Sequence, residues 1–374
     1  MKIAIFGGSF NPVHNEHIKV AKGAIKELNL DKLIVMPTFI SPHKKSAEFI
    51  SAEHRLNMLN LAFSGEKAVE VSSYEIDKGG VSYTFETITH FKKLYPTAKI
   101  YFMLGSDMLE NFPTWKHPDI ILNNCTLLLT ERRTGEFDDD ALIDKIYSLY
   151  KSKVERLKVY GETISSTKIR THYKLGLSLD GLVPKSVEDY IINNCVYESD
   201  FYYEYIKKVL PIKRRIHTAG VITTAIDLAK KLKVDEKKAE LSALLHDVAK
   251  YEDINNYNGV GIPSDLPSDI IHQYLGEYIA RTKLNVKDGD VLLAIKYHTT
   301  GRANMTMLEK VIYIADLIEP SRKFQGVEKL REEINKDFFK GFKICLEEIV
   351  EFLKLSGKEV YSLTLEALKG EIYE

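Results

Sequence analysis

The chain has 374 residues, a length typical of about two domains. Apolar residues make up 44% and charged residues 28% of the sequence, a balance that excludes a mainly disordered chain. A net charge of −1 excludes a general basic field for nucleic acid, and no apolar run approaches the roughly 20 residues that span a bilayer. Three widely spaced cysteines exclude a disulfide framework and indicate a reducing, cytoplasmic compartment.

Short apolar runs alternate with helical patterns in the first half of the chain. Residues 2–6 are the first expected strand, and residues 17–28 have helical spacing. Further strands are expected at residues 33–36, 69–71, 100–104 and 125–130. This alternation predicts crossover connections and a mainly parallel sheet. Because the runs are continuously apolar, we expect both faces of the sheet to be covered.

The second half has helical period in nearly every stretch from residue 201 onward. One helical face carries Leu241, Leu244, Leu245 and Val248, and residues 308–317 have similar spacing. Residues 259–267 contain glycine and proline breaks and predict a loop, whereas the charged tail at 329–373 is expected to be helical. We therefore expect an α/β domain over residues 1–198 and an all-α domain over residues 199–374.

A glycine-rich segment follows the first expected strand and precedes a helix. Its residues are Gly7, Gly8, Ser9, Phe10 and Asn11. Glycines let the backbone approach a ligand closely, and the helix start offers free N–H groups to phosphate. His14 and His17 are three residues apart, so they share one face there and can donate hydrogen bonds to a phosphoryl group during transfer. A glycine turn with surface histidines is the alternative.

A second polar segment begins another helix about 150 residues later. Ser165, Ser166 and Thr167 can cap that helix or bind phosphate oxygens, and Arg170 adds a fork suited to phosphate. Alone, this segment indicates only a helix cap. Together with the glycine-rich segment, it predicts a site that handles phosphate.

These two segments resemble the HxGH and ISSTxIR motifs of the nucleotidyltransferase superfamily. Here Glu16 stands where that superfamily usually has glycine, and it adds negative charge near the expected triphosphate. Other segments narrow the resemblance, over about residues 1–198, to nicotinate mononucleotide adenylyltransferases. They are Met36-Pro37, Ser41-Pro42-His43-Lys44, Arg55 to Met58, Ser82-Tyr83-Thr84, Gly105-Ser106-Asp107 and Trp115-Lys116-His117-Pro118.

The resemblance implies a Rossmann-like sheet and transfer of AMP from ATP to nicotinate mononucleotide, with deamido-NAD and pyrophosphate as products. The mononucleotide phosphate is the nucleophile, so catalysis rests on positioning and charge neutralisation. The implied catalytic residues are His14, His17, Lys44 and Arg170, with Mg²⁺ that arrives with ATP. Implied nucleotide and substrate contacts are Gly7, Gly8, Ser9, Phe10, Asn11, Ser82, Tyr83, Thr84, Gly105, Ser106, Asp107, Trp115, Ser165, Ser166 and Thr167. Trp115 would stack on the pyridine ring, unless it only fills the core. A related transferase, such as the phosphopantetheine enzyme, is the rival.

Histidine and aspartate gather in the second half of the sequence. The set is His217, His246, Asp247, His272, His298 and Asp316. Imidazole and carboxylate together suit Fe, Mn, Zn or Mg. Aspartate in an apolar stretch is costly to bury without a partner, and a metal would remove that cost. Separate solvated histidines are the alternative.

This pattern resembles the HD phosphohydrolase superfamily, and most closely its bacterial symmetrical diadenosine tetraphosphate hydrolases, over about residues 200–374. The matching segments are 244–250, 297–305 and 310–322. The resemblance implies that His217, His246, Asp247 and Asp316 bind a divalent or ferric metal, iron foremost, with Mn, Zn or Mg as alternatives. His272 and His298 would bind a second metal or the substrate phosphates, and Lys250 and Arg322 would contact phosphates. Metal-activated water would cleave the substrate into two ADP, with Asp247 essential to catalysis.

We therefore expect a bifunctional enzyme whose partners are the small molecules ATP, nicotinate mononucleotide and diadenosine tetraphosphate, without nucleic acid or membrane. One rival makes the helical domain a nucleotide-sensing regulatory module. Another gives it a different substrate, such as guanosine tetraphosphate or deoxynucleotides. The sequence leaves open the metal, a homo-oligomeric state, and the reason for the fusion.

Overall fold

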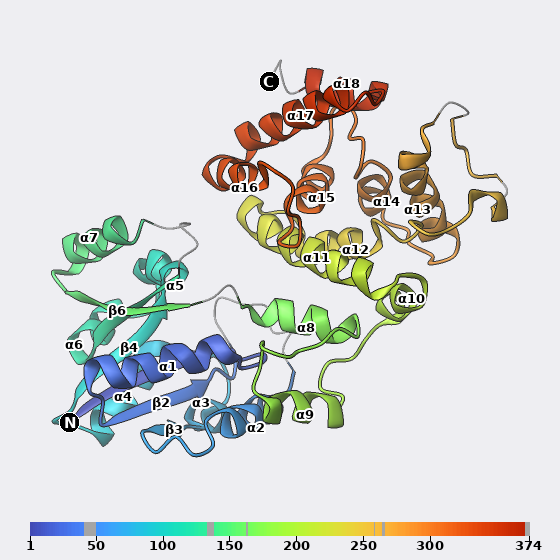
Figure 1. Ribbon diagram of the computed structural model, residues 1–374. Coiled ribbons are helices and arrows are strands. Elements are labelled where there is room, and N and C mark those ends of the chain that lie inside the picture. Colours follow the sequence, from blue (N-terminus) through green and yellow to red (C-terminus); the bar gives the residue numbers. More distant parts are fainter. Residues whose placement is uncertain (41–49, 133–137, 162–163, 258, 264–265, 371–374) are drawn as a thin grey trace. The chain divides into compact units, whose positions relative to one another are not determined.

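The computed structural model describes residues 1–40, 50–132, 138–161, 164–257, 259–263 and 266–370 (Figure 1). The chain forms two compact units. The first unit comprises Met1–Arg170 and Leu179–Tyr197, and the second comprises Thr171–Ser178 and Glu198–Glu374. The break at Tyr197 lies one residue before the boundary expected at 198, and residues 171–178 also belong to the second unit. Lys44, an expected catalytic residue, lies outside the described residues.

The first unit is built on a six-stranded sheet in the order β3-β2-β1-β4-β5-β6, and every strand pair is parallel. The strands are β1 (Lys2–Gly8), β2 (Lys32–Pro37), β3 (Val69–Val71), β4 (Lys99–Gly105), β5 (Thr126–Arg132) and β6 (Val154–Gly161). The parallel sheet was predicted correctly. Strand β6 was not predicted, because an edge strand that mixes Glu155, Arg156 and Lys158 with apolar residues has no continuous apolar run.

Helices connect these strands and cover the sheet (Figure 1). They are α1 (Asn15–Leu28), α2 (Ala52–Ala62), α3 (Tyr74–Lys78), α4 (Thr84–Leu94), α5 (Ser106–Asn111), α6 (Pro118–Asn124), α7 (Asp139–Tyr150), α8 (Ser166–Lys174) and α9 (Lys185–Asn193), with a short 3-10 helix, η2 (Phe112–Thr114). Ile3, Ala4 and Ile5 of β1 have no exposed surface, so both faces of the central strand are covered. The strand order reverses between β1 and β4, the place where open parallel sheets bind ligands at the carboxyl ends of their strands.

The second unit is helical throughout its described residues, as predicted. Its helices are α10 (Phe201–Val209), α11 (Ile212–Leu232), α12 (Glu236–Leu245), α13 (Ile271–Thr282), α14 (Gly289–Lys296), α15 (Met307–Ile318), α16 (Val327–Lys336), α17 (Phe338–Leu355) and α18 (Ser362–Gly370), with 3-10 helices η3 (Ile254–Asn256) and η4 (Ser268–Ile270). Within the described ranges, none of the helices is both long enough and apolar enough to span a membrane.

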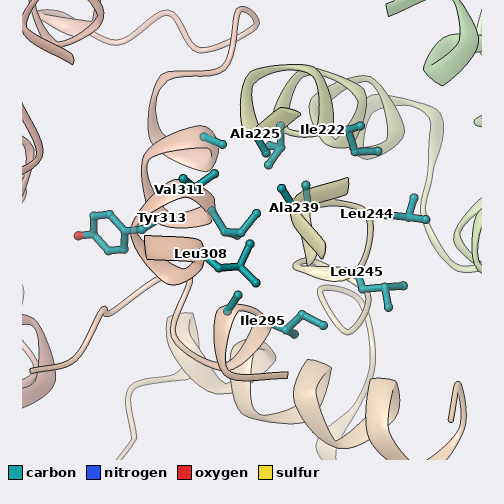
Figure 2. Close-up of a cluster of buried hydrophobic side chains, with 14 of the residues drawn as sticks. Ile222, Ala225, Ala239, Leu244, Leu245, Ile295, Leu308, Val311 and Tyr313 are labelled. Carbon is teal, nitrogen blue, oxygen red and sulfur yellow. The ribbon is translucent and has the colours of Figure 1, made fainter. Parts of the chain in front are cut away.

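The core of the second unit lies between α11, α12, α14 and α15 (Figure 2). Leu244 and Leu245 of α12 belong to this buried cluster, together with Ile222 of α11 and Val311 of α15. The predicted apolar face is therefore buried, although Leu241 is only partly covered. Helix α12 ends at Leu245, so His246 and Asp247 follow directly from a helix fixed in the core.

Candidate active sites

The loop after β1 is held in a tight conformation. A Cβ on Gly8 would lie 3.1 Å from the ring of Phe10, which is buried and has a φ of 44°. Arg55, only 1% exposed, donates from Nη1 to the carbonyl oxygens of Ser9 at 3.0 Å and Thr38 at 2.5 Å. Arg55 thus ties the loop after β1 to the segment after β2. In the sequence, Arg55 stood out only as part of the family resemblance.

His14 and His17 form a reciprocal cap at the start of α1. The backbone N–H of His17 donates to His14 Nδ1 at 3.4 Å, and the backbone N–H of His14 donates to His17 Nδ1 at 3.2 Å. The two rings stack with centroids 3.5 Å apart. Because each Nδ1 accepts a hydrogen bond, a neutral ring carries its proton on Nε2. Both histidines are therefore arranged to donate from Nε2, as a phosphate-handling role requires.

The start of α8 contacts the same loop. Arg170 Nη1 donates to the carbonyl of Asn11 at 2.8 Å, and the Ser166 hydroxyl donates to the carbonyl of Pro12 at 2.9 Å. Ser165 accepts from the backbone N–H of Lys168 at 3.2 Å, and Thr167 accepts from Arg170 Nη2 at 3.3 Å. The structure therefore brings the two sequence motifs together. Arg170 contacts Asn11, which precedes His14 by three residues.

Tyr197 fixes the loop from a third direction, because its hydroxyl donates to Asn11 Oδ1 at 3.1 Å. Burial raises the pKa of the Tyr197 phenol, so it remains a donor at neutral pH. The sequence offered no signal for Tyr197, since its nearest motif lies about 30 residues away.

Other predicted contacts lie at neighbouring strand ends. Gly105 ends β4 and Ser106 begins α5, and a Cβ on Gly105 would lie 2.8 Å from Asp107 Oδ1. Ser82 accepts from the backbone N–H of Phe39 at 3.0 Å and precedes Tyr83 and Thr84, where α4 starts. These positions place the predicted residues near the carboxyl edge of the sheet.

Trp115 lies in the core of the first unit, where it is 8% exposed and packs against Phe102 and Phe112 with centroid distances of 6.1 and 5.2 Å. The next residue, Lys116, places its Nζ 4.5 Å from the ring centroid of Tyr83. The predicted segments around Ser82 and Trp115 are therefore adjacent. Stacking of Trp115 on a pyridine ring stays a prediction.

The six histidines and aspartates of the second unit come from five helices or their ends. His217 lies on α11, His246 and Asp247 follow α12, His272 lies on α13, His298 follows α14, and Asp316 lies on α15. All four histidines and Asp247 are buried. Residues up to about 100 positions apart are thus gathered in one place, as the sequence analysis expected.

Asp247 joins two groups of ligand atoms. His217, His246 and Asp247 offer atoms that lie within 4.8 Å of one another, and so do Asp247, His272 and His298. Asp247 Oδ2 is 3.2 Å from His246 Nε2, while Oδ1 is 3.4 Å from His272 Nε2. Asp316 Oδ1 lies 3.0 Å from His217 Nε2 and extends the first group.

Three of these imidazoles have a fixed orientation. His246 Nδ1 donates to the carbonyl of Ala243 at 2.7 Å, and His298 Nδ1 donates to the carbonyl of Ile295 at 2.7 Å. His217 Nδ1 lies 3.0 Å from Glu319 Oε1. In the neutral His246 and His298 rings the proton is therefore on Nδ1, and the Nε2 lone pair faces the cluster.

Protonation in the cluster also favours cation binding. Burial lowers the pKa of His272 to about 3 and that of His298 to about 4, and neighbouring positive groups add to the effect. Burial opposes ionisation of Asp247 and Asp316, but hydrogen bonds and charge from His246 and His217 hold both pKa values well below their usual range. His272 and His298 are thus neutral and Asp247 and Asp316 ionised, which are the forms that ligate metals, so these residues fit a metal ion. Burial lowers the pKa of His217, but hydrogen bonds to Asp316 and Glu319 raise it overall, so a cation that binds there displaces a proton.

Among the described residues, three cationic side chains contact the cluster. Arg214 Nη1 contacts Asp247 Oδ2 at 2.8 Å, Arg322 contacts Asp316, and Lys250 Nζ lies 3.2 Å from His272 Nε2. Lys250 and Arg322 were predicted. Arg214 and Glu319 were missed, although each lies three residues from a predicted ligand in the sequence, and that helical spacing was the available signal.

Comparison with known proteins matches both units. A model of cytidylyltransferase-like proteins matches residues 5–172, and a model of the HD domain matches residues 214–321. A probable nicotinate-nucleotide adenylyltransferase/Ap4A hydrolase of Mycoplasma genitalium is 31% identical over 374 residues, which cover 99% of this chain and 98% of that protein.

Shorter relatives match one unit each. The nicotinate-nucleotide adenylyltransferase of Bacillus subtilis is 33% identical over 198 residues, 53% of this chain and 99% of that protein. A crystal structure of a predicted HD superfamily hydrolase involved in NAD metabolism from Clostridium acetobutylicum is 34% identical and covers 46% of this chain and 94% of that chain, with a TM-score of 0.42.

Proposed function

Because the chain belongs to the family of nicotinate-nucleotide adenylyltransferase/Ap4A hydrolase proteins, we propose that it carries out both reactions. The first unit transfers the adenylyl group of ATP to nicotinate mononucleotide. The second unit hydrolyses diadenosine tetraphosphate symmetrically to two ADP.

This proposal rests on what the Nε2 atoms of the histidines offer: a proton in the first unit and a lone pair in the second. His14 and His17 present N–H donors at a helix N-terminus, the arrangement that suits phosphate oxygens. His246 and His298 present lone pairs beside the carboxylate of Asp247, the arrangement that suits a cation. One chain thus holds one site for phosphate and another for a metal.

In adenylyl transfer, an oxygen of the mononucleotide phosphate forms a bond to the α-phosphorus of ATP while the bond from that phosphorus to pyrophosphate breaks. No protein nucleophile is needed. His14, His17 and Arg170 stabilise the charge that shifts onto the leaving pyrophosphate, and Mg²⁺ arrives with the triphosphate. Arg55 and Tyr197 keep the loop that carries these groups in place.

In hydrolysis, water adds to a phosphorus of the tetraphosphate and the central P–O–P bridge breaks, which gives two ADP. His217, His246, Asp247 and Asp316 would hold the metal, which we propose is iron. A bound ion supplies activation of water and neutralisation of phosphate charge. Arg214, Lys250 and Arg322 hold the polyphosphate chain against the cluster.

The adenylyl-transfer proposal is tested by pyrophosphate release from ATP with nicotinate mononucleotide, nicotinamide mononucleotide or phosphopantetheine as acceptor. We expect nicotinate mononucleotide to give the highest kcat/KM. Preference for phosphopantetheine would assign the first unit to another transferase.

The hydrolysis proposal is tested with metal-loaded full-length protein, diadenosine tetraphosphate and separation of the products. ADP as sole product supports symmetrical cleavage, whereas ATP plus AMP would contradict it. Guanosine tetraphosphate and deoxynucleoside triphosphates serve as competing substrates. If no nucleotide is hydrolysed although metal is bound, the second unit is a sensing module. Elemental analysis of the protein as purified, before any metal is added, identifies the metal.

A further inference from the structure

Glu319, the residue that follows α15, is a fully buried carboxylate beside the histidine cluster. Its Oε1 lies 3.0 Å from His217 Nδ1, on the opposite side of the ring from the cluster. His246 and His298 direct Nδ1 to backbone carbonyls, so among these three oriented rings only His217 faces a carboxylate at Nδ1.

The surroundings of Glu319 hold its carboxylate in one position. The backbone N–H of Ser321 donates to Oε2 at 2.7 Å, and the Ser321 hydroxyl donates to Oε1. On the facing helix α11, a Cβ on Gly220 would lie 2.1 Å from Oε2. The carboxylate therefore fits into space that exists only because residue 220 is glycine, one turn from His217.

His217 lies between two carboxylates. Asp316 Oδ1 is 3.0 Å from Nε2, and Glu319 Oε1 is 3.0 Å from Nδ1. A neutral imidazole has one proton, so it can donate to only one of these oxygens. If the proton were on Nε2, His217 would bond Asp316 and could not bind a cation. The ionised acceptor at Nδ1 competes for that proton and releases the Nε2 lone pair.

We propose that Glu319 is a positioning residue that keeps the proton of His217 on Nδ1, and so makes its Nε2 atom a cation ligand. This role rests on the proposed cation site of the second unit. Carboxylates behind metal-binding imidazoles also raise ligand basicity, and their loss typically weakens metal binding about 10–100-fold. Gly220 contributes to this arrangement, because it provides the space for the Glu319 carboxylate.

Three variants of the full-length protein test the role. Glu319→Ala removes both the acceptor and the charge, so we expect Mn²⁺ affinity to fall about 10–100-fold. Glu319→Gln keeps an acceptor oxygen without charge and should recover part of that loss. Gly220→Ala leaves Glu319 chemically intact but displaces it, and should weaken binding as Glu319→Ala does.

A matched control is Glu309→Gln on the same helix. Glu309 is 1% exposed, pairs with Arg302 at 2.7 Å and lies about two helical turns before Asp316, so the variant disturbs a buried glutamate of α15 without removing a contact of His217. Calorimetric titration with Mn²⁺ should give near wild-type affinity for this control. If Mn²⁺ affinity falls equally in Glu309→Gln and Glu319→Ala, the loss reflects general destabilisation of the protein. That result would overturn the positioning role of Glu319.

The proton itself is observed by ¹⁵N NMR of metal-free protein labelled at histidine, where protonated and lone-pair nitrogens differ in chemical shift. The spectra are recorded at a pH high enough for His217 to be neutral, since hydrogen bonds to Asp316 and Glu319 raise its pKa despite burial. We expect His217 to carry its proton on Nδ1 in wild type and to lose that preference in Glu319→Ala. Unchanged Mn²⁺ affinity or an unchanged His217 spectrum in Glu319→Ala overturns the positioning role. A wild-type protein that binds no Mn²⁺, Fe²⁺ or Zn²⁺ overturns the cation site itself, and this role with it.

Discussion

The two units use the same side chain in opposite ways. In the first unit, His14 and His17 accept backbone N–H groups at Nδ1 and carry their protons on Nε2. In the second, His246 and His298 donate from Nδ1 to backbone carbonyls and present a lone pair at Nε2. The imidazoles of the first unit therefore suit phosphate, and those of the second suit a cation.

Helix polarity explains this difference. His14 and His17 lie at the N-terminus of α1, where unpaired N–H groups are available. His246 and His298 directly follow the C-terminal turns of α12 and α14, where unpaired carbonyls accept the Nδ1 proton. The end of the helix at which a histidine lies thus determines which nitrogen remains for chemistry.

The largest effect is expected from removing the shared carboxylate of the second unit. Asp247→Ala takes an oxygen from both ligand groups, so hydrolysis of diadenosine tetraphosphate should fall by at least about 10³-fold and metal content should drop. Treatment with a chelator should have the same effect on hydrolysis, reversed by added metal. Adenylyl transfer, measured in the same sample with added Mg²⁺, should remain within about twofold of wild type. A parallel loss of both activities would contradict separate sites.

The next effect concerns the Nε2–H donors of the first unit. His17→Ala should lower kcat for adenylyl transfer about 10²–10³-fold, the usual cost of one donor to developing charge. His17→Gln places an amide N–H near the position of Nε2 and should recover part of kcat. His14→Asn keeps an acceptor for the cap but has no group at Nε2, so it should fold with normal thermal stability and still be slow. If His17→Gln is no faster than His17→Ala, donation from Nε2 is not the basis of the role.

More of the fold than of the two candidate sites could be predicted from the sequence. Continuous apolar runs predicted β1, β2, β4 and β5, because buried parallel strands need such runs. The polar edge strand β6 gave no such signal. Motifs singled out His14, Arg170 and the second-unit histidines as candidates, and the family resemblance included Arg55 without giving it a role. The contacts of Tyr197, Arg214 and Glu319 are created only by the folded chain. A single buried glutamate or arginine has no periodic pattern, so its partner must be seen in three dimensions.

Arg214 places a positive charge beside the proposed cation site of the second unit. Its guanidinium lies 2.8 Å from Asp247 Oδ2 and repels any cation bound there, but it also attracts phosphate. Arg214→Gln should therefore raise metal affinity at least about tenfold and raise KM for diadenosine tetraphosphate by a similar factor. The exposed neighbour Lys213→Gln is the control, with little change expected in either quantity. Titration calorimetry and steady-state kinetics give the two numbers. A fall in metal affinity would mean that Arg214 orients Asp247 instead of competing with the ion.

The smallest effect concerns a buried acid of the first unit, Glu75. The acids of the histidine cluster face cations or imidazoles, whereas Glu75, 6% exposed, accepts from the hydroxyl of Thr87, and burial raises its pKa. A raised pKa in the folded state means that the stabilising contribution is complete below the unfolded value of 4.5 and is lost as pH rises through the folded value. Ionised Glu75 therefore destabilises the first unit at neutral pH.

Glu75→Gln should accordingly stabilise the first unit at pH 7–8, by about 1 kcal/mol, with the gain vanishing near pH 4. Trp115 is the only tryptophan and lies in the core of the first unit, so thermal melts followed by its fluorescence report on that unit. The exposed Glu110→Gln in the same unit serves as the control, with no pH-dependent gain. A gain that is independent of pH would assign the stabilisation to packing of the amide. A loss at neutral pH would show that the ionised carboxylate is held by its neighbours, as Asp247 and Asp316 are in the second unit.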